Sequence, residues 1–129
     1  MYTIIFLSTD NVLSIHEAHI KMFGGAPGIR DRHLLDSAVL APQATFAGSY
    51  LHVDMFAMAA AYMHSIIKNH PFFDGNKRTG ISTGLVFLRA NDIPCYFSNE
   101  ELVEFGINIA NSTSSFEDIA EQLRHRCNQ

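Results

Sequence analysis

One stretch of nine residues, 70–78, combines a histidine, an aspartate, a glycine, an asparagine and two cations between two apolar segments. Asp74 and Gly75 form a dipeptide that is typical of turns, and glycine can adopt the positive φ that lets a backbone approach a ligand closely. His70 precedes a proline, which disfavours helix at His70 itself. We therefore expect the preceding helix to end at His70, with the imidazole at the rim of a short loop.

The two cations, Lys77 and Arg78, fall in the first turn of a helix that we expect to begin at about Asn76. The start of a helix carries a partial positive charge and unpaired N–H groups, so it disfavours a cation by a few tenths of a kcal/mol, up to about 1. A phosphate bound there would accept hydrogen bonds from the free amides, while Lys77 supplied a point charge and Arg78 a planar fork. The pattern therefore indicates a phosphate site.

Each side chain of the stretch suits a role at such a site. His70 is the candidate general base, because an imidazole can take a proton from a hydroxyl near neutral pH. Asp74 is the candidate Mg²⁺ ligand, since magnesium binds one or two carboxylates and keeps several waters beside a phosphate. Phe72 is expected to pack in the core and anchor the loop. The remaining groups would bind the phosphates of a nucleotide and stabilise charge on the transferred group: Gly75, Asn76, Lys77 and Arg78.

An ordinary interhelical loop is the alternative. In that interpretation Asp74 and Asn76 only cap a helix, and Lys77 and Arg78 are solvated. For any single residue this alternative is the better one, whereas the joint arrangement favours the phosphate site.

The same residues resemble the signature of the Fic/Doc family, His-x-Phe-x-(Asp/Glu)-(Gly/Ala)-Asn-(Gly/Lys)-Arg, and every fixed position is met. Lys77, followed by Arg78 and Thr79, is similar to the Doc (death on curing) branch. The resemblance extends to residues 16–18, 24–31 and 85–89, and so covers most of the chain. It implies the Fic fold, a compact all-α bundle of about six helices.

This resemblance implies transfer of part of a nucleoside triphosphate, such as ATP, to a protein hydroxyl, with Mg²⁺ held by Asp74. Adenylylating members usually carry a second arginine three residues after the first, where this chain has Ile81. The difference favours the Doc-like reaction, in which the terminal phosphate goes to a threonine of a translation GTPase. An adenylyltransferase and a non-catalytic module that binds a nucleotide or an antitoxin remain alternatives. Doc relatives are toxins, so an antitoxin is an expected partner.

The composition is consistent with one globular domain, residues 1–129, with a real core. Apolar residues make up 47% and charged residues 17% of the chain, which excludes a disordered protein. The formal charge of −4 leaves no excess of cations for general nucleic-acid binding.

Targeting and cysteine signals are weak. The apolar start, residues 3–7, lacks the basic leader and small-residue cleavage site of a secretory signal. The longest apolar run, residues 55–67, is shorter than the roughly 20 residues that span a bilayer. We therefore expect a cytoplasmic protein with no membrane contact. Cys95 and Cys127 show no paired spacing, so two reduced thiols are expected.

Helical signals dominate the rest of the chain. Helices are predicted from Ser8 or Thr9 to about Phe23, from Asp31 to Pro42 and from Val53 to Asn69. Two capping boxes, at residues 98–101 and 114–117, should open two more. A short two-stranded element could pair residues 3–7 with residues 94–97.

Two glycines, Gly80 and Gly84, stand four residues apart in the helix expected after the loop. Each costs about 1 kcal/mol relative to alanine, which we expect to be offset by close approach of another backbone. Ala57, Ala60 and Ala61 provide a small face on the preceding apolar helix. These two helices should therefore cross closely and clamp the loop, although crowded packing without catalytic consequence would also explain the glycines.

Three other features are weaker candidates. His16 and His19 lie three residues apart and could share a metal, but a third ligand is lacking, so a partly exposed helix face is favoured. Residues 113–118 partly resemble the inhibitory Ser/Thr-x-x-x-Glu motif of some Fic proteins, but a capping box explains them more simply. Residues 41–52 could form a flap that aligns a target peptide, or pack as an ordinary hydrophobic loop.

Overall fold

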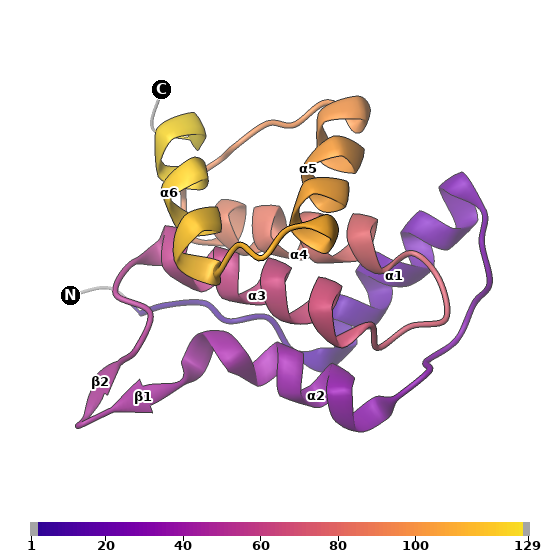
Figure 1. The fold of residues 1–129 in the computed structure, drawn as a ribbon. Helices are drawn as coiled ribbons and strands as arrows, with labels where there is room; N and C mark the ends of the chain where they lie inside the picture. Colours follow the sequence, from indigo (N-terminus) through magenta and orange to yellow (C-terminus); the bar gives the residue numbers. More distant parts are fainter. Residues whose placement is uncertain (1–2, 128–129) are drawn as a thin grey trace.

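The computed structural model describes residues 3–127, which form a bundle of six α-helices with one small hairpin (Figure 1). The helices are α1 (Thr9–Phe23), α2 (Arg32–Leu40), α3 (Met55–Asn69), α4 (Asn76–Ala90), α5 (Asn99–Asn111) and α6 (Phe116–Cys127). A 3₁₀ turn, Ala41–Gln43, and the strands β1 (Thr45–Phe46) and β2 (Ser49–Tyr50) lie between α2 and α3. The all-α prediction is confirmed.

Helix α3 is the centre of the bundle and contacts α2, α4, α5 and α6 (Figure 1). Its residues are apolar on nearly every side because neighbours surround it, and the run from Ala57 to Met63 is buried without interruption. This confirms the expected core helix. Within residues 3–127, no helix combines the length and the apolarity that crossing a bilayer would require.

The predicted close crossing of α3 and α4 is confirmed, but its contacts differ from those expected. A methyl group added at Gly80 would lie 2.8 Å from Ile67 Cγ1, and one added at Gly84 would lie 2.5 Å from Met63 Cε and 3.0 Å from the Ala59 carbonyl oxygen. The glycines therefore face flexible side chains of α3 and two of its backbone carbonyls, those of Met63 and Ala59. The prediction of an alanine face was wrong because Met63, a long adaptable residue, fills the same space.

Substituting Gly84 with alanine should destabilise the protein. The new methyl gains up to about 1 kcal/mol in helix propensity, but overpacking against a backbone carbonyl costs about 1–3 kcal/mol. A net loss of roughly 1 kcal/mol is expected in urea-induced unfolding. Val86→Ala, at an exposed position of the same helix, is the control and should change stability by less than about 0.5 kcal/mol. A Gly84→Ala protein as stable as the wild type would contradict the tight crossing.

Most helix starts lie where the capping residues predict them. Side chains of Ser8, Asp31, Asp54 and Ser98 accept hydrogen bonds from the first turns of α1, α2, α3 and α5. The box expected at residues 114–117 is displaced by one: the Ser115 and Asp118 side chains bond to each other's backbone N–H groups instead. Aspartate replaces glutamate as the reciprocal partner, which the simple Ser-x-x-Glu pattern could not identify.

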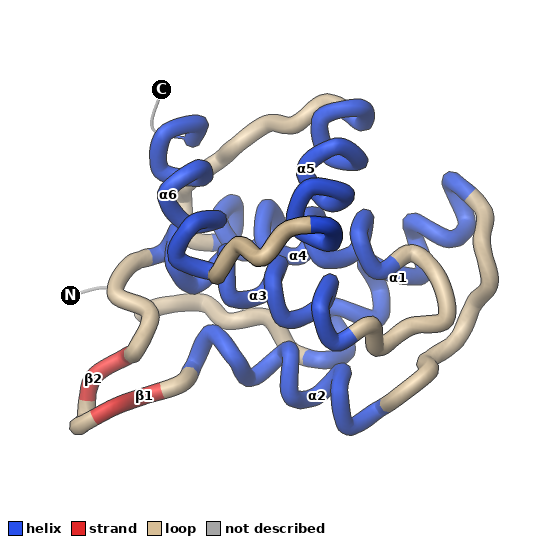
Figure 2. Tube along the Cα trace, in the orientation of Figure 1, coloured by secondary structure: helices blue, strands red, loops and turns tan. Residues whose placement is uncertain are grey.

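The expected β pairing of residues 3–7 with residues 94–97 was wrong. Ile5 instead pairs its N–H and C=O with the side-chain amide of Asn91, at 2.9 Å each, so one carboxamide replaces the partner strand. The hairpin forms in the segment predicted as a loop, where β1 and β2 pair antiparallel around a turn at Ala47 and Gly48, both with positive φ (Figure 2).

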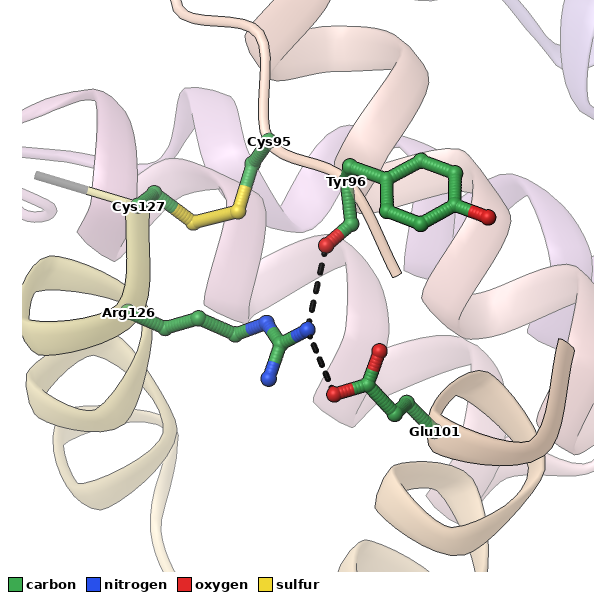
Figure 3. Close-up of a disulfide and its surroundings, with 5 residues drawn as sticks. All are labelled: Cys95, Tyr96, Glu101, Arg126 and Cys127. Atoms are coloured by element: carbon green, nitrogen blue, oxygen red, sulfur yellow. Dashed lines mark hydrogen bonds and ion pairs between the residues drawn. A yellow bond between two sulfur atoms is a disulfide. The ribbon is translucent and has the colours of Figure 1, made fainter. Parts of the chain in front are cut away.

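The expectation of two reduced thiols was also wrong, because Cys95 and Cys127 form a disulfide in this structure (Figure 3). The bond joins the α4–α5 connection to the last residue of α6. Beside it, Arg126 donates to the Tyr96 carbonyl oxygen and pairs with Glu101 Oε2 at 2.8 Å. The cysteines are 32 residues apart, and only the packing of α6 against the bundle brings them together.

Two histidines around the start of α6 should make stability depend on pH. His52 is buried and His64 half-buried, and both rings lie edge-on to Phe116. Burial lowers the pKa of both, assisted at His64 by Lys68 and opposed at His52 by Glu117. Below pH 6.5 the unfolded chain then binds more protons than the folded protein, so stability should fall as the pH decreases from 7.5 to 5.5.

Urea unfolding at several pH values checks this expectation. His64→Gln should give a shallower loss of stability with falling pH than the wild type, whereas His33→Gln, at an exposed position, should retain the wild-type slope. Equal slopes for all three proteins would show that His64 does not titrate differently in the folded state.

Candidate active site

His70 ends α3 in an unusual backbone conformation. It is the C-cap residue with φ 54° and ψ 54°, the left-handed region that non-glycine residues rarely adopt. Arg30 stabilises this turn, because its Nε donates to the His70 carbonyl oxygen at 2.6 Å and its Nη2 to that of Asn69 at 3.0 Å. The His70 side chain is exposed. The imidazole therefore lies at the rim of the loop on a fixed backbone, as a general base requires.

The loop after His70 is closed by Asn76. The Asn76 carboxamide is buried and makes two 3.0 Å hydrogen bonds, accepting from the Phe72 N–H and donating to the Phe72 carbonyl oxygen. The Phe72 ring is fully buried in the core formed by α1, α2 and α3. The sequence suggested Asn76 as a phosphate contact, but here its side chain holds the loop closed by bonding to the Phe72 backbone. The buried Phe72 ring fixes the loop to the core.

A second segment, residues 28–31, runs antiparallel along the loop. Ile29 forms an isolated β-bridge with Phe72, the N–H groups of Arg30 and Asp31 donate to the Pro71 carbonyl oxygen, and Phe73 donates to Gly28. The loop is therefore held by its own asparagine on one side and by this segment on the other.

Asp74 is exposed, and each of its carboxylate oxygens accepts one backbone hydrogen bond. Oδ1 accepts from the Gly75 N–H at 2.9 Å and Oδ2 from the Ala26 N–H at 3.1 Å. None of the ion pairs among residues 3–127 involves Asp74. An oriented carboxylate without a cation partner fits the requirement of Mg²⁺, which binds through one or two carboxylates, waters and substrate phosphates.

The start of α4 differs from the other helix starts of the described chain. Gly75 is its N-cap residue, with φ 77°, and no side chain caps it, whereas serine or aspartate side chains cap the other five helices. Across residues 3–127, no hydrogen bond uses the N–H groups of Asn76, Lys77 or Arg78. These amides point out of the first turn with their partial positive charge uncompensated, which fits an anion.

Among residues 3–127, neither cation of this turn is paired with a carboxylate. Lys77 is exposed, and its backbone packs against Gly106 of α5. The Arg78 guanidinium lies 3.7 Å from the centre of the Phe23 ring and donates through Nη1 to Asn99 Oδ1 at 2.6 Å. The side chain is thus held between the end of α1 and the start of α5 while keeping its full positive charge.

Of the two histidines of α1, only His19 lies on the partly exposed face that the sequence predicted. His16 is only 3% exposed, although a partly exposed face was expected. Its Nε2 lies 2.8 Å from the Asp74 carbonyl oxygen and its ring stacks on Phe72. His19 bonds to Ser82, and burial, together with the charge of Arg78, lowers its pKa. Among the described residues no group of three potential ligands forms a metal cluster.

Comparison with known proteins assigns this arrangement to a family. Residues 6–88, which include the whole loop, match the model of the Fic/DOC family. The chain belongs to the Fic/Doc family.

Two relatives place it in the Doc branch of that family. It is 30% identical over 118 residues to the protein kinase doc of Escherichia phage P1, covering 92% of each chain. It is 42% identical over 88 residues to the toxin Doc of Mycolicibacterium smegmatis, covering 68% of this chain and 65% of that relative.

Two features of this Fic/Doc site bear on the expectations from the sequence, namely the position of the second arginine and the location of a flap. Ile81, at the position where adenylylating members carry a second arginine, is fully buried in the core, so this position supplies no positive charge to the site. The hairpin of residues 45–50 lies at the start of α3, whereas the loop follows its end, about 22 Å away for a 15-residue helix (Figure 1). This placement does not support a flap over the loop, which residues 28–31 line instead.

Proposed function

We propose that this chain is a Doc-like toxin that transfers the terminal phosphate of a nucleoside triphosphate to a protein hydroxyl. The expected acceptor is a threonine of a translation GTPase, whose modification would arrest growth. The observation that carries the proposal is the start of α4, next to the exposed imidazole of His70. Within the described part of the chain, it has three unused amides and two cations without carboxylate partners.

In this reaction the His70 ring accepts the proton of the acceptor hydroxyl while its oxygen bonds to the terminal phosphorus. The bond from that phosphorus to the bridging oxygen breaks, and the nucleoside diphosphate leaves. The amides of α4, Lys77 and Arg78 would hold the phosphates and oppose their charge. When bound, Mg²⁺ would neutralise phosphate oxygens, with Asp74 as its protein ligand.

Two observations favour phosphate over nucleotide transfer. Buried Ile81 supplies no second cation for the rest of the triphosphate, and the phage P1 relative that matches over 92% of its length is named a protein kinase. Adenylylation remains the second candidate, because the loop itself would accept either orientation of a triphosphate.

Mass spectrometry of modified proteins separates these reactions. The purified chain is incubated with ATP, Mg²⁺ and a cell lysate. One added phosphate on a target protein supports phosphoryl transfer, and one added nucleotide supports adenylylation. If neither modification appears with the wild type, or if both persist with His70→Ala, the enzymatic proposal is overturned, which leaves a binding module.

A growth assay tests the biological part of the proposal. Expression in the bacterial cytoplasm, where the donor and the translation machinery are present, should arrest growth, and His70→Ala should relieve the arrest. Co-expression of the gene that neighbours this one tests for an antitoxin, the partner expected of a Doc toxin. Growth that is unaffected by the wild-type protein would contradict a toxin role.

A further inference from the structure

We propose that His16 is a positioning residue that orients the metal-binding carboxylate of Asp74 through the backbone of the loop. The inference rests on the proposed function, because it assigns His16 a purpose only if Asp74 binds a divalent cation with the nucleotide. His16 lies 58 residues before Asp74, on a different helix.

The hydrogen bond defines which ring nitrogen acts. His16 Nε2 lies 2.8 Å from the Asp74 carbonyl oxygen. A carbonyl oxygen can only accept, so Nε2 must carry the proton and donate it. Because the ring is only 3% exposed, water has little access to replace this donor, and a loop without it would leave the carbonyl poorly satisfied.

The ring itself is fixed by the buried part of the loop. It stacks on Phe72 with centroids 3.8 Å apart and planes at 5°. Two ring atoms also lie 3.6 Å from the position that a Cβ of Gly75 would occupy. His16 therefore packs against the loop on both sides of Asp74, at Phe72 and beside Gly75, and hydrogen-bonds to Asp74 itself.

Asp74 is consequently held at three points that come from three segments. Its carbonyl oxygen accepts from His16 of α1, Oδ1 accepts from Gly75 in the loop, and Oδ2 accepts from Ala26 in the segment after α1. The two carboxylate bonds set the side chain relative to its neighbours, and the His16 bond sets the peptide plane that carries the side chain. Outer partners of this kind commonly change metal affinity by about 10–100-fold when removed.

A purely structural histidine would give a different result, so the test compares metal binding with stability. The paired variants are His16→Gln, whose amide can extend to the Nε2 position, and His16→Asn, whose shorter amide cannot. His16→Phe, which keeps the stacking on Phe72 and loses the donor, is the third variant. Binding of the Mn²⁺–ATP complex, without any target protein, is measured by the enhancement of the water proton relaxation rate over that of the same mixture without protein, and unfolding is measured on the same samples.

We expect His16→Asn and His16→Phe to weaken Mn²⁺ binding by about 10-fold or more, and His16→Gln to restore most of it. The Mg²⁺ concentration that gives half-maximal transfer should rise in the same order, with a smaller effect on the rate at saturating Mg²⁺. Losses of stability without any change in Mn²⁺ affinity would overturn the proposal, as would equal affinities for the Gln and Asn variants.

The experiment distinguishes failure of the His16 role from failure of the proposed function. If the wild type binds Mn²⁺ with ATP and modifies a target while the His16 variants behave like it, only the role of His16 is wrong. If the wild type binds no Mn²⁺ with ATP and Asp74→Asn changes nothing, the proposed function and this inference are both wrong.

Discussion

Replacing His70 with alanine should reduce the rate of protein modification by about 10²–10⁴-fold, the usual contribution of a positioned general base. Because the His70 side chain is exposed and no hydrogen bond to its ring is present among residues 3–127, its removal should cost little stability. The loss is measured as the initial rate of label transfer from γ-³²P-ATP to the identified target, with unfolding followed in parallel.

Two variants make this result specific. His70→Asn also removes the base, but asparagine tolerates the left-handed backbone of this position, so it separates loss of the base from disturbance of the turn. His33→Ala removes an exposed histidine of α2 and should retain full activity. An active His70→Asn protein would exclude His70 as the base.

Loss of the Cys95–Cys127 disulfide should destabilise the protein by about 3–4 kcal/mol, according to the chain-entropy relation for a loop of this length. The bond restricts the unfolded chain, and in the folded state it holds the end of α6 next to Arg126, Glu101 and Tyr96 (Figure 3). For a domain of this size the melting temperature should fall by roughly 10 °C.

Thermal unfolding with and without a dithiol reductant measures this effect. The wild type should melt at a lower temperature when reduced, whereas Cys127→Ser should melt at that lower temperature under both conditions. Thiol alkylation before and after reduction establishes the redox state of each sample. An oxidised wild type with the melting temperature of its reduced form would show that the bond adds no stability.

The sequence predicted those parts of the fold whose causes are local. Ser8, Asp31 and Ser98 cap helices within a few residues of themselves, and the proline after His70 ends α3 by a steric effect on its neighbour. The one-residue shift at Ser115 shows the limit, because Ser114 and Ser115 have the same side chain and the local pattern does not distinguish between them.

Contacts between distant residues could not be predicted in the same way. Asn91 replaces a strand opposite Ile5 across 86 residues, and His16 meets Asp74 across 58. A histidine on a helix has the same local pattern whether it is solvated or buried under a loop. The composition of the loop therefore indicated the candidate base and metal ligand, while the histidine that bonds to the Asp74 carbonyl oxygen was identified only from the packing of α1.

In the candidate site, too, the features with local causes were predictable and those that depend on distant contacts were not. The clash between Lys77, Arg78 and the positive end of α4 is a local property, and it was sufficient to indicate an anion site. The role of Asn76 in closing the loop depends on the path of the backbone back to Phe72, which an expected turn does not specify.

The placement of Arg78 also has a consequence for the entropy of binding. A free arginine side chain loses about 1.5–2 kcal/mol of rotamer freedom when it is immobilised by a ligand. Here one face of the guanidinium already lies on Phe23 and Nη1 already bonds Asn99, whereas Nε and Nη2 make no hydrogen bond within residues 3–127. An anion that binds Nε and Nη2 therefore binds an arginine whose motion is already restricted. Little further side-chain entropy is lost on binding.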